Sequence, residues 1–482
     1  MKIEEIDVDA AIESVKQSLK EEKGLSPAFR SSLELLLVLV KLLLDRVTLN
    51  SSTSSIPPSA DPHRKKKPRA KRPRKPGGQE GHEGKTLEPV ENPDNIVPIE
   101  IDKRTIPTGV PYQVTGYEAR QVIDIKISRL VTEYRAQILE DPDGNQYVAE
   151  FPPEVLSRAQ YGNTIKTHAV YMSQFQLIPY DRVRDHFVDQ MQIPLSAGTI
   201  FNFNKQAFNA LEFFEQWVKS QLTASALMHV DETGININGK RHWLHCASNL
   251  SYTHYFPHEQ RGTEAMDEIG IIPQFTGVMC HDHWKPYYTY LFCLHQLCNA
   301  HHLRELERAW EQDKQQWAES MKIFLIELNE AVEKAKGKLA PKQAKRWHER
   351  YQEILEQAQQ ECPPPKDTRP KGTRGRLKRS KSRNLLERLI RYEDDVLRFM
   401  TEPIVPFTNN QGENDIRMTK VQQKISGCFR SMEGAKMFCR IRSYLSTCRK
   451  NGLSATKALD MLFAGEKPAF MSRSIESATQ TA

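Results

Sequence analysis

The sequence predicts an α/β protein whose centre is a mixed five-stranded sheet with helices around it. Two observations indicate this class. From about residue 226, short apolar runs of strand length alternate with polar segments. From Leu306 to about Gln360, apolar residues instead recur every three or four positions, which is the period of a helix. The five expected strands cover residues 226–231, 241–248, 252–257, 275–281 and 290–295.

Changes in composition divide the chain into eight segments. Ser and Pro are frequent just after residue 50, and three consecutive prolines at 363–365 end the long helical run. The expected order is a helical segment (1–49), a linker with a basic arm (50–84), a small β module (85–154), a helical region (155–222), the first part of the sheet domain (223–302), a helical insertion with a basic loop (303–400), the second part of the sheet domain (401–465) and a tail (466–482).

The N-terminal segment predicts one strongly apolar helix. Its apolar residues repeat every seven positions in two sets, Phe29, Leu36 and Leu43 in one and Leu33, Val40 and Val47 in the other. Further leucines and valines broaden this stripe. Such a helix needs a partner, which is either another helix of the same chain or a second copy of the protein.

Positive charge is concentrated in two short segments, although the net charge of +7 is modest. Nine of the twelve residues from Arg64 to Lys75 are Lys or Arg, as are seven of the thirteen from Lys371 to Arg383. Such blocks favour a polyanionic partner, and a solvated, unstructured tract is the alternative. Prolines keep the first block extended, which suits a DNA groove or a line of phosphates. Its expected DNA-binding residues are Arg64, Lys65, Lys66, Lys67, Arg69, Lys71, Arg72, Arg74 and Lys75.

The two regions that follow the arm have different residue patterns. Ile123, Ile125 and Ile127 alternate with polar residues, and the turn signal at 141–145 predicts a hairpin. Further on, a helix at 180–190, a turn and a helix from Ala197 have the outline of a helix-turn-helix. The same outline is common in ordinary helical bundles, so both interpretations stay open.

Cysteine usage indicates a reducing compartment. All eight cysteines lie at or after Cys246, with no CxxC pair. A disulfide framework is therefore not expected. The expected location is the cytoplasm, in association with the nucleoid. The most apolar stretch, Leu33–Val47, is interrupted by charges and falls short of the roughly 20 residues that span a bilayer, so no membrane role follows.

Three acidic residues are the expected catalytic and metal-binding residues. Asp231 and Asp282 each close an apolar run, and Glu413 follows Asn409 and Asn410 at the expected start of a helix. Strand ends can aim two carboxylates into one crevice, and a helix can add a third. Such a set suits Mg²⁺ or Mn²⁺, and two ions would serve a phosphodiester reaction.

One aspartate at a strand end is usually a turn or capping residue, so the order of all three carries the prediction. Strands ending in Asp231 and Asp282, followed by a helical insertion before Glu413, match the layout of ribonuclease-H-like nucleic-acid enzymes. The rival ligands are Glu232 and Asp415, although Asp415 would face away from Glu413 on a regular helix.

Several neighbouring side chains have a structural and a functional interpretation. A zinc site is conceivable at Cys293, His295, Cys298, His301 and His302, but no regular finger has this spacing and a buried core is the alternative. Strand alternation points His281 and His283 away from Asp282. Trp284 is either a core residue or a platform for an unpaired base. Phosphate contacts are expected at Arg417, Lys420, Lys424 and Arg430, unless Arg417 simply pairs with Glu413.

Longer motifs carry a family resemblance. They are Asn50-Ser51-Ser52, Gly77-Gly78-Gln79-Glu80-Gly81-His82, His229-Val230-Asp231-Glu232-Thr233, His281-Asp282-His283-Trp284-Lys285-Pro286-Tyr287, Cys298-Asn299-Ala300-His301-His302-Leu303-Arg304-Glu305-Leu306, Asn409-Asn410-Gln411-Gly412-Glu413-Asn414-Asp415-Ile416-Arg417 and Lys424-Ile425-Ser426-Gly427-Cys428-Phe429-Arg430-Ser431. With these, the chain resembles the bacterial DDE transposases of insertion sequence family sixty-six nearly from end to end. One departure is that the cysteine-based, zinc-finger-like module of that family has no cysteines here. We expect the β module to fold without zinc.

The resemblance implies a transposase that cuts DNA at the ends of its element and joins them to target DNA. Asp231, Asp282 and Glu413 would form the triad, with a ribonuclease-H-like core around them. Implied partners are DNA, further copies of the chain in a dimer or larger assembly, and small accessory proteins of the same element. Two other functions are a catalytically inactive DNA-end-binding regulator of the same fold and a nuclease that cuts without joining.

Overall fold

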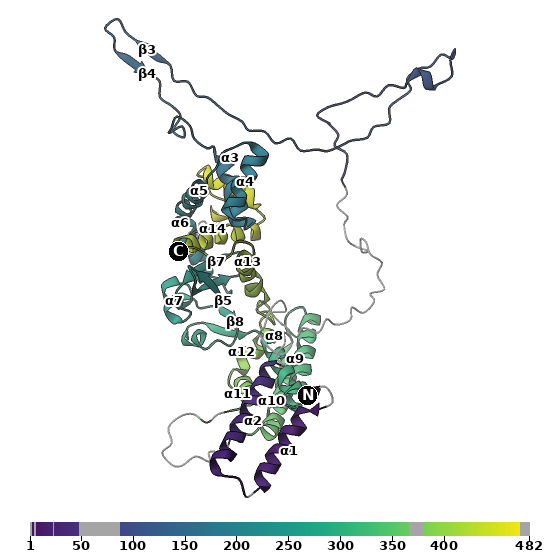
Figure 1. The fold of residues 1–482 in the computed structure, drawn as a ribbon, viewed down its shortest axis with the longest axis vertical. Coiled ribbons are helices and arrows are strands. Elements are labelled where there is room, and N and C mark those ends of the chain that lie inside the picture. Colours follow the sequence, from purple (N-terminus) through teal and green to yellow (C-terminus); the bar gives the residue numbers. More distant parts are fainter. Residues whose placement is uncertain are drawn as a thin grey trace. The chain divides into compact units, whose positions relative to one another are not determined.

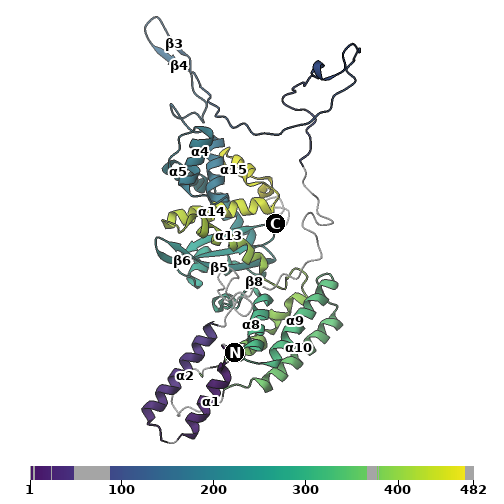
Figure 2. The same ribbon diagram turned by 45° about the vertical axis from the view of Figure 1, so that its right-hand side comes forward.

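The computed structural model describes residues 2–3, 6–22, 24–47, 87–365, 377 and 379–472 of the 482-residue chain (Figures 1 and 2). The backbone forms two units. The larger comprises Met1–Arg64, Glu150–His186 and Pro194–Ala482, and the smaller comprises Lys65–Ala149 and Phe187–Ile193. The basic arm at 64–75 and most of the basic loop after residue 365 lie outside the described residues.

The larger unit contains the expected mixed sheet of five strands. They are β5 (Leu227–Ile237), β6 (Lys240–Ser248), β7 (Thr253–His258), β8 (Val278–His281) and β9 (Leu294–Leu297). Their order across the sheet is β7-β6-β5-β8-β9. The first three strands are antiparallel, whereas β8 is parallel to both β5 and β9. The α/β class and the mixed five-stranded sheet are therefore confirmed, although β9 begins four residues after the start of the strand expected at 290–295.

The first strand is longer than the sequence predicts. Asp231 was expected to end it, but β5 continues to Ile237 and Asp231 lies within it, opposite Cys246 of β6. The polar residues after Asp231 stay in the strand because β6 returns beside them through a tight turn. That turn is made by Asn238 and Gly239, which both have positive φ, as two-residue hairpin turns require.

Two long helices near the C-terminus pack on this sheet. They are α13 (Asn410–Ser426) and α14 (Met432–Lys450), followed by α15 (Ala455–Phe463). Ile235 and Leu244 from the strands share a buried cluster with Ile416 of α13 and Phe438 of α14. Short helices join the later strands, namely α7 (Thr263–Ile269), η3 (Ile272–Gln274) and η4 (Lys285–Thr289).

The insertion between β9 and α13 is helical, as predicted. It contains α8 (Asn299–Glu311), α9 (Gln316–Lys334), α10 (Pro341–Glu361), α11 (Lys381–Arg391), α12 (Glu393–Leu397) and η5 (Arg398–Met400). Its own core contains Trp317, Phe324 and Tyr351, which are all fully buried. The same buried cluster includes Val278 of β8 and Leu297 of β9, so the insertion also packs against this part of the sheet.

The region before the sheet is helical, which was also expected. Its elements are α3 (Asn163–Val170), η2 (Tyr171–Phe175), α4 (Tyr180–Met191), α5 (Ala197–Ala210) and α6 (Glu212–Thr223). The expected turn before Ala197 is present, because Ser196 caps α5 by accepting a hydrogen bond from the Thr199 N–H. Whether these helices recognise DNA stays a prediction.

The smaller unit has less regular structure than the β module that the sequence predicts. A hairpin of β3 (Ile138–Glu140) and β4 (Gln146–Val148) forms around the expected turn, and η1 (Lys103–Thr105) precedes it. The strand expected around Ile123 and Ile127 is absent, and both side chains are exposed. That prediction was wrong because no described segment pairs with these residues, and an unpaired strand leaves its backbone groups without partners.

The N-terminal residues form a short β1–β2 pair (Lys2–Ile3 with Ile6–Asp7) and two helices, α1 (Val8–Glu21) and α2 (Pro27–Val47). The apolar helix is confirmed as α2. Phe29, Leu36 and Leu43, one of its two heptad sets, are each more than half exposed. No helix in the described part of the chain is both long and apolar enough to cross a membrane.

Candidate active site

Asp231 lies in β5, and Asp282 is the residue directly after the neighbouring parallel strand β8. In the β5–β8 pairing, Leu227 lies opposite Val278 and His229 lies opposite Cys280. Continuing this register by two residues places Asp282 opposite Asp231. Neighbouring strands lie about 5 Å apart, and residues of matching register point to the same face. The two carboxylates therefore lie together where the parallel pairing ends.

Asn409 brings the third carboxylate to the same strand. Its side-chain N–H donates to the Val230 carbonyl oxygen at 2.9 Å, and its Oδ1 lies 2.7 Å from the Nδ1 of His229. Asn409 is also the residue from which α13 begins, because its carbonyl oxygen accepts the Glu413 N–H at 3.1 Å. Gly412 allows this approach, since a Cβ there would stand 3.1 Å from the Asn409 amide.

Electrostatic coupling connects the three acids. Burial raises the pKa of Asp231 well above its usual value, and the charges of Glu232, Asp282 and Glu413 raise it further. Burial also raises the pKa of Asp282, against the opposing influence of Arg261 and Arg388. Such crowding of like charges is unfavourable in the absence of a cation.

Glu232, the first rival ligand, is already engaged. Its side chain is 2% exposed and accepts hydrogen bonds from Arg261 at 2.9 and 2.5 Å and from the Tyr287 hydroxyl at 2.5 Å. Arg261 itself is stacked between two indole rings, 4.8 Å from the centroid of Trp243 and 4.4 Å from that of Trp284. Glu232 therefore orders the surroundings of Asp231 and has no carboxylate oxygen without a partner.

Asp415, the second rival, is engaged too. It accepts from Lys450 at 2.7 Å and from Gln411 at 2.9 Å, on a side of α13 other than that of Glu413. By contrast, Oε1 of Glu413 is buried and has no hydrogen-bond partner in the described part of the chain. His301 Nδ1 and Arg304 Nη2 each lie 3.8 Å from this oxygen, and burial lowers the pKa of His301 to about 4, so only Arg304 is positively charged near neutral pH. The expected alternative pairing of Glu413 with Arg417 is not formed.

The donor set fits a hard divalent cation. Carboxylate oxygens are the ligands that Mg²⁺ and Mn²⁺ prefer. The raised pKa of Asp231 and the buried, unpartnered oxygen of Glu413 both indicate positions at which a cation would be stabilised.

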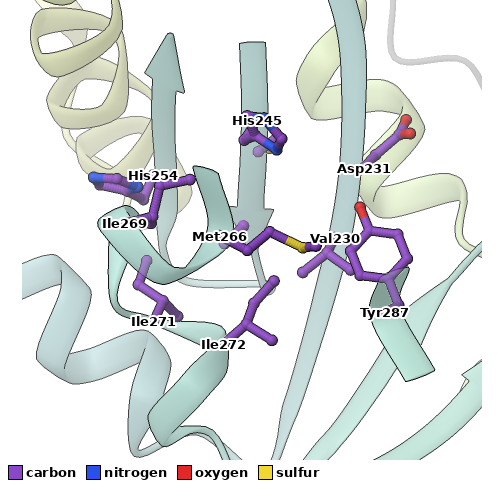
Figure 3. A pocket seen from close by; sticks show the side chains of 11 residues that line it. Val230, Asp231, His245, His254, Met266, Ile269, Ile271, Ile272 and Tyr287 are labelled. Carbon is purple, nitrogen blue, oxygen red and sulfur yellow. The ribbon is translucent and has the colours of Figure 1, made fainter. Parts of the chain in front are cut away.

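A small apolar pocket lies beside Asp231 (Figure 3). Val230, Met266 and Ile272 line it, and it has space for little more than a water molecule. In Figure 3 the Asp231 carboxylate points away from these side chains. The pocket is therefore part of the packing that buries one side of Asp231, and it is too small for a substrate.

The histidines beside Asp282 make contacts of their own. His281 is buried with its Nε2 2.9 Å from the Nδ1 of His295, and Nδ1 of His283 lies 2.7 Å from the Tyr288 hydroxyl. Burial lowers the pKa of both to about 3, so both are neutral. Their ring nitrogens contact His295 and Tyr288, and the expectation that both rings point away from Asp282 stays a prediction. Trp284 is half-buried and is covered by Arg261.

The expected zinc candidates do not form one group. Cys293 and His302 are buried at other positions, and the ring of His295 contacts that of His281. Cys298 and His301 instead lie beside Glu413. Sequence reasoning missed the roles of Asn409 and Arg261, and of His301 as a neighbour of Glu413. Only the motif around Asn409 offered a signal, because it joins a helix-capping residue type to an acid four residues on.

Four basic residues in α13 or just after it are exposed, as residues that contact phosphates must be. They are Arg417, Lys420, Lys424 and Arg430. Lys420 donates to the Gly234 carbonyl oxygen at 2.9 Å beside Arg241, in an open hollow next to β5. DNA binding by these residues stays a prediction.

The structure is an α/β protein with a mixed five-stranded sheet, in which Asp282 and Glu413 lie near enough to Asp231 for their charges to raise its pKa. Comparison with known families matches residues 158–437 to the Transposase IS66 family. The chain belongs to this family. It is also similar to y4jO, an uncharacterized protein of Sinorhizobium fredii (strain NBRC 101917 / NGR234), with 37% identity over 70 residues. That match spans 14% of this chain and 22% of y4jO.

Proposed function

We propose that this protein is a DNA transposase that cuts at the ends of an insertion sequence and joins them to target DNA. Family membership supports DNA transposition in general. The observation that carries the finer proposal is the shared register of Asp231 and Asp282, with Glu413 electrostatically coupled to Asp231. The strand order β7-β6-β5-β8-β9, with α13 packed against it, supports a ribonuclease-H-like core.

Asp231, Asp282 and Glu413 would hold Mg²⁺ or Mn²⁺, in a site for two ions. When bound, such ions polarise a phosphodiester and lower the pKa of a bound water. The contribution of the chain itself is to position the carboxylates. β5 and β8 hold two carboxylates in register, and the hydrogen bonds of Asn409 hold the start of α13 beside them.

Other side chains would place the DNA. Arg417, Lys420, Lys424 and Arg430 would bind phosphates along α13, and the arm from Arg64 to Lys75 would add salt-dependent affinity. The proposed reaction has two steps, attack by water at the element end and then attack by the freed 3′-hydroxyl on target DNA. Holding two ends at once requires at least two copies of the chain, and accessory proteins of the same element are further proposed partners.

The test incubates the protein with Mg²⁺ and labelled DNA ends. Joined products support the transposase. Cleaved but unjoined products would indicate a nuclease, and bound but unchanged DNA an inactive end-binding regulator. Asp282→Ala should abolish cleavage and joining while DNA binding persists. Asp460→Ala, a change at an exposed aspartate of α15, is the matched control and should leave all three unchanged. Strand transfer by the Asp282→Ala variant would refute the triad.

A further inference from the structure

A second group of metal-binding side chain types lies at the edge of the carboxylate site. Sγ of Cys298, a ring nitrogen of His301 and a carboxylate oxygen of Glu413 all lie within 4.8 Å of one another. Cys298 occupies the N-cap position of α8, and His301 lies three residues later on the same side of that helix. Glu413 comes from the first turn of α13, more than a hundred residues away.

The backbone holds these residues firmly. The Cys298 N–H donates to the His281 carbonyl oxygen at 2.9 Å, and its carbonyl oxygen accepts the His301 N–H at 3.1 Å. The Cys298 sulfur accepts the Asn409 N–H at 3.1 Å, so the thiol also contacts the residue that starts α13. The group is therefore built from two helix starts fixed to the same sheet.

Two of the three ligand atoms have no hydrogen-bond partner. His301 Nδ1 and Glu413 Oε1 are both buried and unpartnered among the described residues, and at 3.8 Å they are too far apart to bond each other. Arg304 Nη2 lies 3.8 Å from the Glu413 oxygen, which is also too far for a hydrogen bond. Leaving two buried polar atoms without hydrogen bonds costs a few kcal/mol. A water molecule could bridge them, but it would make no use of the thiol beside them.

A transition metal would use all three. Thiolate and imidazole ligands select ions such as Zn²⁺, whereas Mg²⁺ avoids them. Ligand atoms around tetrahedral zinc lie roughly 3 to 4 Å apart, so the group needs to contract by only about 1 Å. Three protein ligands also leave one coordination position open, as in zinc sites that exchange ligands.

We propose that Cys298, His301 and Glu413 bind one divalent ion of the zinc class, and that this ion withdraws Glu413 from Asp231 and Asp282. The second part rests on the proposed function, because it makes the ion an inhibitor of DNA joining. On binding, the Cys298 thiol releases its proton to solvent, and Arg304 moves away from Glu413.

The binding test uses Co²⁺ as a coloured substitute for Zn²⁺ on the full chain. One equivalent of Co²⁺ should produce a thiolate-to-cobalt charge-transfer band, and one equivalent of Zn²⁺ should remove it. Cys298→Ser should abolish the band and weaken Zn²⁺ binding by at least roughly a hundredfold. Cys293→Ser, which alters another buried cysteine outside the group, should retain both the cobalt band and the affinity for Zn²⁺. A wild-type protein without the band would overturn the proposal, whatever the variants do.

Two further variants separate the metal site from the catalytic proposal. Asp231→Asn should keep the cobalt band, because Asp231 is not a ligand, whereas His301→Asn should weaken Zn²⁺ binding as Cys298→Ser does. In DNA joining with excess Mg²⁺, one equivalent of Zn²⁺ should reduce the wild-type rate at least roughly tenfold, and this ratio should approach one in Cys298→Ser. Zinc binding without inhibition would overturn the withdrawal of Glu413 and retain the site. A protein that shows the cobalt band but joins no DNA would support the metal site and would contradict only the proposed function.

Discussion

Asp282 directly follows β8, and the parallel register of β5 and β8, continued two residues beyond the last paired position, His229 with Cys280, brings it opposite Asp231. This relationship places two acids side by side at the end of a parallel ladder, where the sheet opens. Burial raises the pKa of both, and the charge of Asp282 raises that of Asp231 further. The predictions below follow from this geometry and from the contacts that support it.

The stability of the metal-free protein should fall as pH rises through the titration of Asp231 and Asp282. Their folded pKa values are raised, so their contribution to stability is complete below the unfolded pKa and is lost as pH rises through the folded value. Mg²⁺ should therefore raise Tm by a few degrees around pH 8 and much less around pH 5. Calorimetry with Mg²⁺ and with EDTA measures this difference. An equal effect of Mg²⁺ at both pH values would contradict it.

The Asp231→Asn variant should be more stable than the wild type in EDTA but inactive. The substitution removes one of several crowded negative charges, and functional sites commonly sacrifice stability in this way. Urea denaturation should show a gain of about 1 kcal/mol, with DNA joining lost. The matched substitution of an exposed acid, Asp460→Asn, should change neither quantity. A destabilised Asp231→Asn protein would indicate that Asp231 is a structural residue.

The Asn409→Ala variant should lose both stability and activity. It removes the side-chain bonds to His229 and Val230 and leaves two buried groups unpaired, which costs about 2 to 3 kcal/mol. Displacement of Glu413 should lower the joining rate roughly a hundredfold. Asn410→Ala, at the exposed neighbouring position, is the control for both measurements. Wild-type joining by Asn409→Ala would show that the start of α13 is held by other contacts.

Glu215 should be a major source of stability at neutral pH. Burial alone would raise its pKa, but the nearby His254, whose Nε2 lies 3.8 Å from Glu215 Oε1, and the hydrogen bonds from Arg440 lower it to about 2. A lowered pKa stabilises the fold above the unfolded value and loses this effect as pH falls toward about 2. Glu215→Gln should therefore cost about 3 kcal/mol at pH 7 in urea denaturation and little in strong acid. Glu212→Gln, at an exposed site on the same helix, should cost nothing measurable.

The exposed apolar residues of α2 should hold copies of the chain together. Leu36 and Leu43 are 54% and 62% exposed. Changing both to Glu should lower the mass found by analytical ultracentrifugation without lowering Tm, because neither residue is buried within the chain. The control is Ser31→Glu, which adds charge to the same helix outside the apolar sets. An unchanged mass would mean that α2 is not the oligomerisation helix.

The sequence alone predicted the five-stranded sheet and the helical insertion correctly, because both depend on local periodicity. It proposed the three acids from motif order. It also predicted that Glu413 and Asp415 would face different ways, since that follows from helix geometry. It misplaced the end of β5, because a strand persists wherever a neighbour pairs with it, and β6 pairs with polar residues. It predicted a strand around Ile125 where no partner exists among the described residues.

Only the tertiary structure decided which acids are available and which are engaged. Glu232 is bound by Arg261 and Tyr287, and Asp415 by Lys450, through residues that lie up to 55 positions away in sequence. No local pattern encodes such pairings, because they depend on how strands and helices pack. The same packing brings Cys298 and His301 to Glu413. Residue type and order thus determined what chemistry the chain can support, and packing decided which side chains are positioned to perform it.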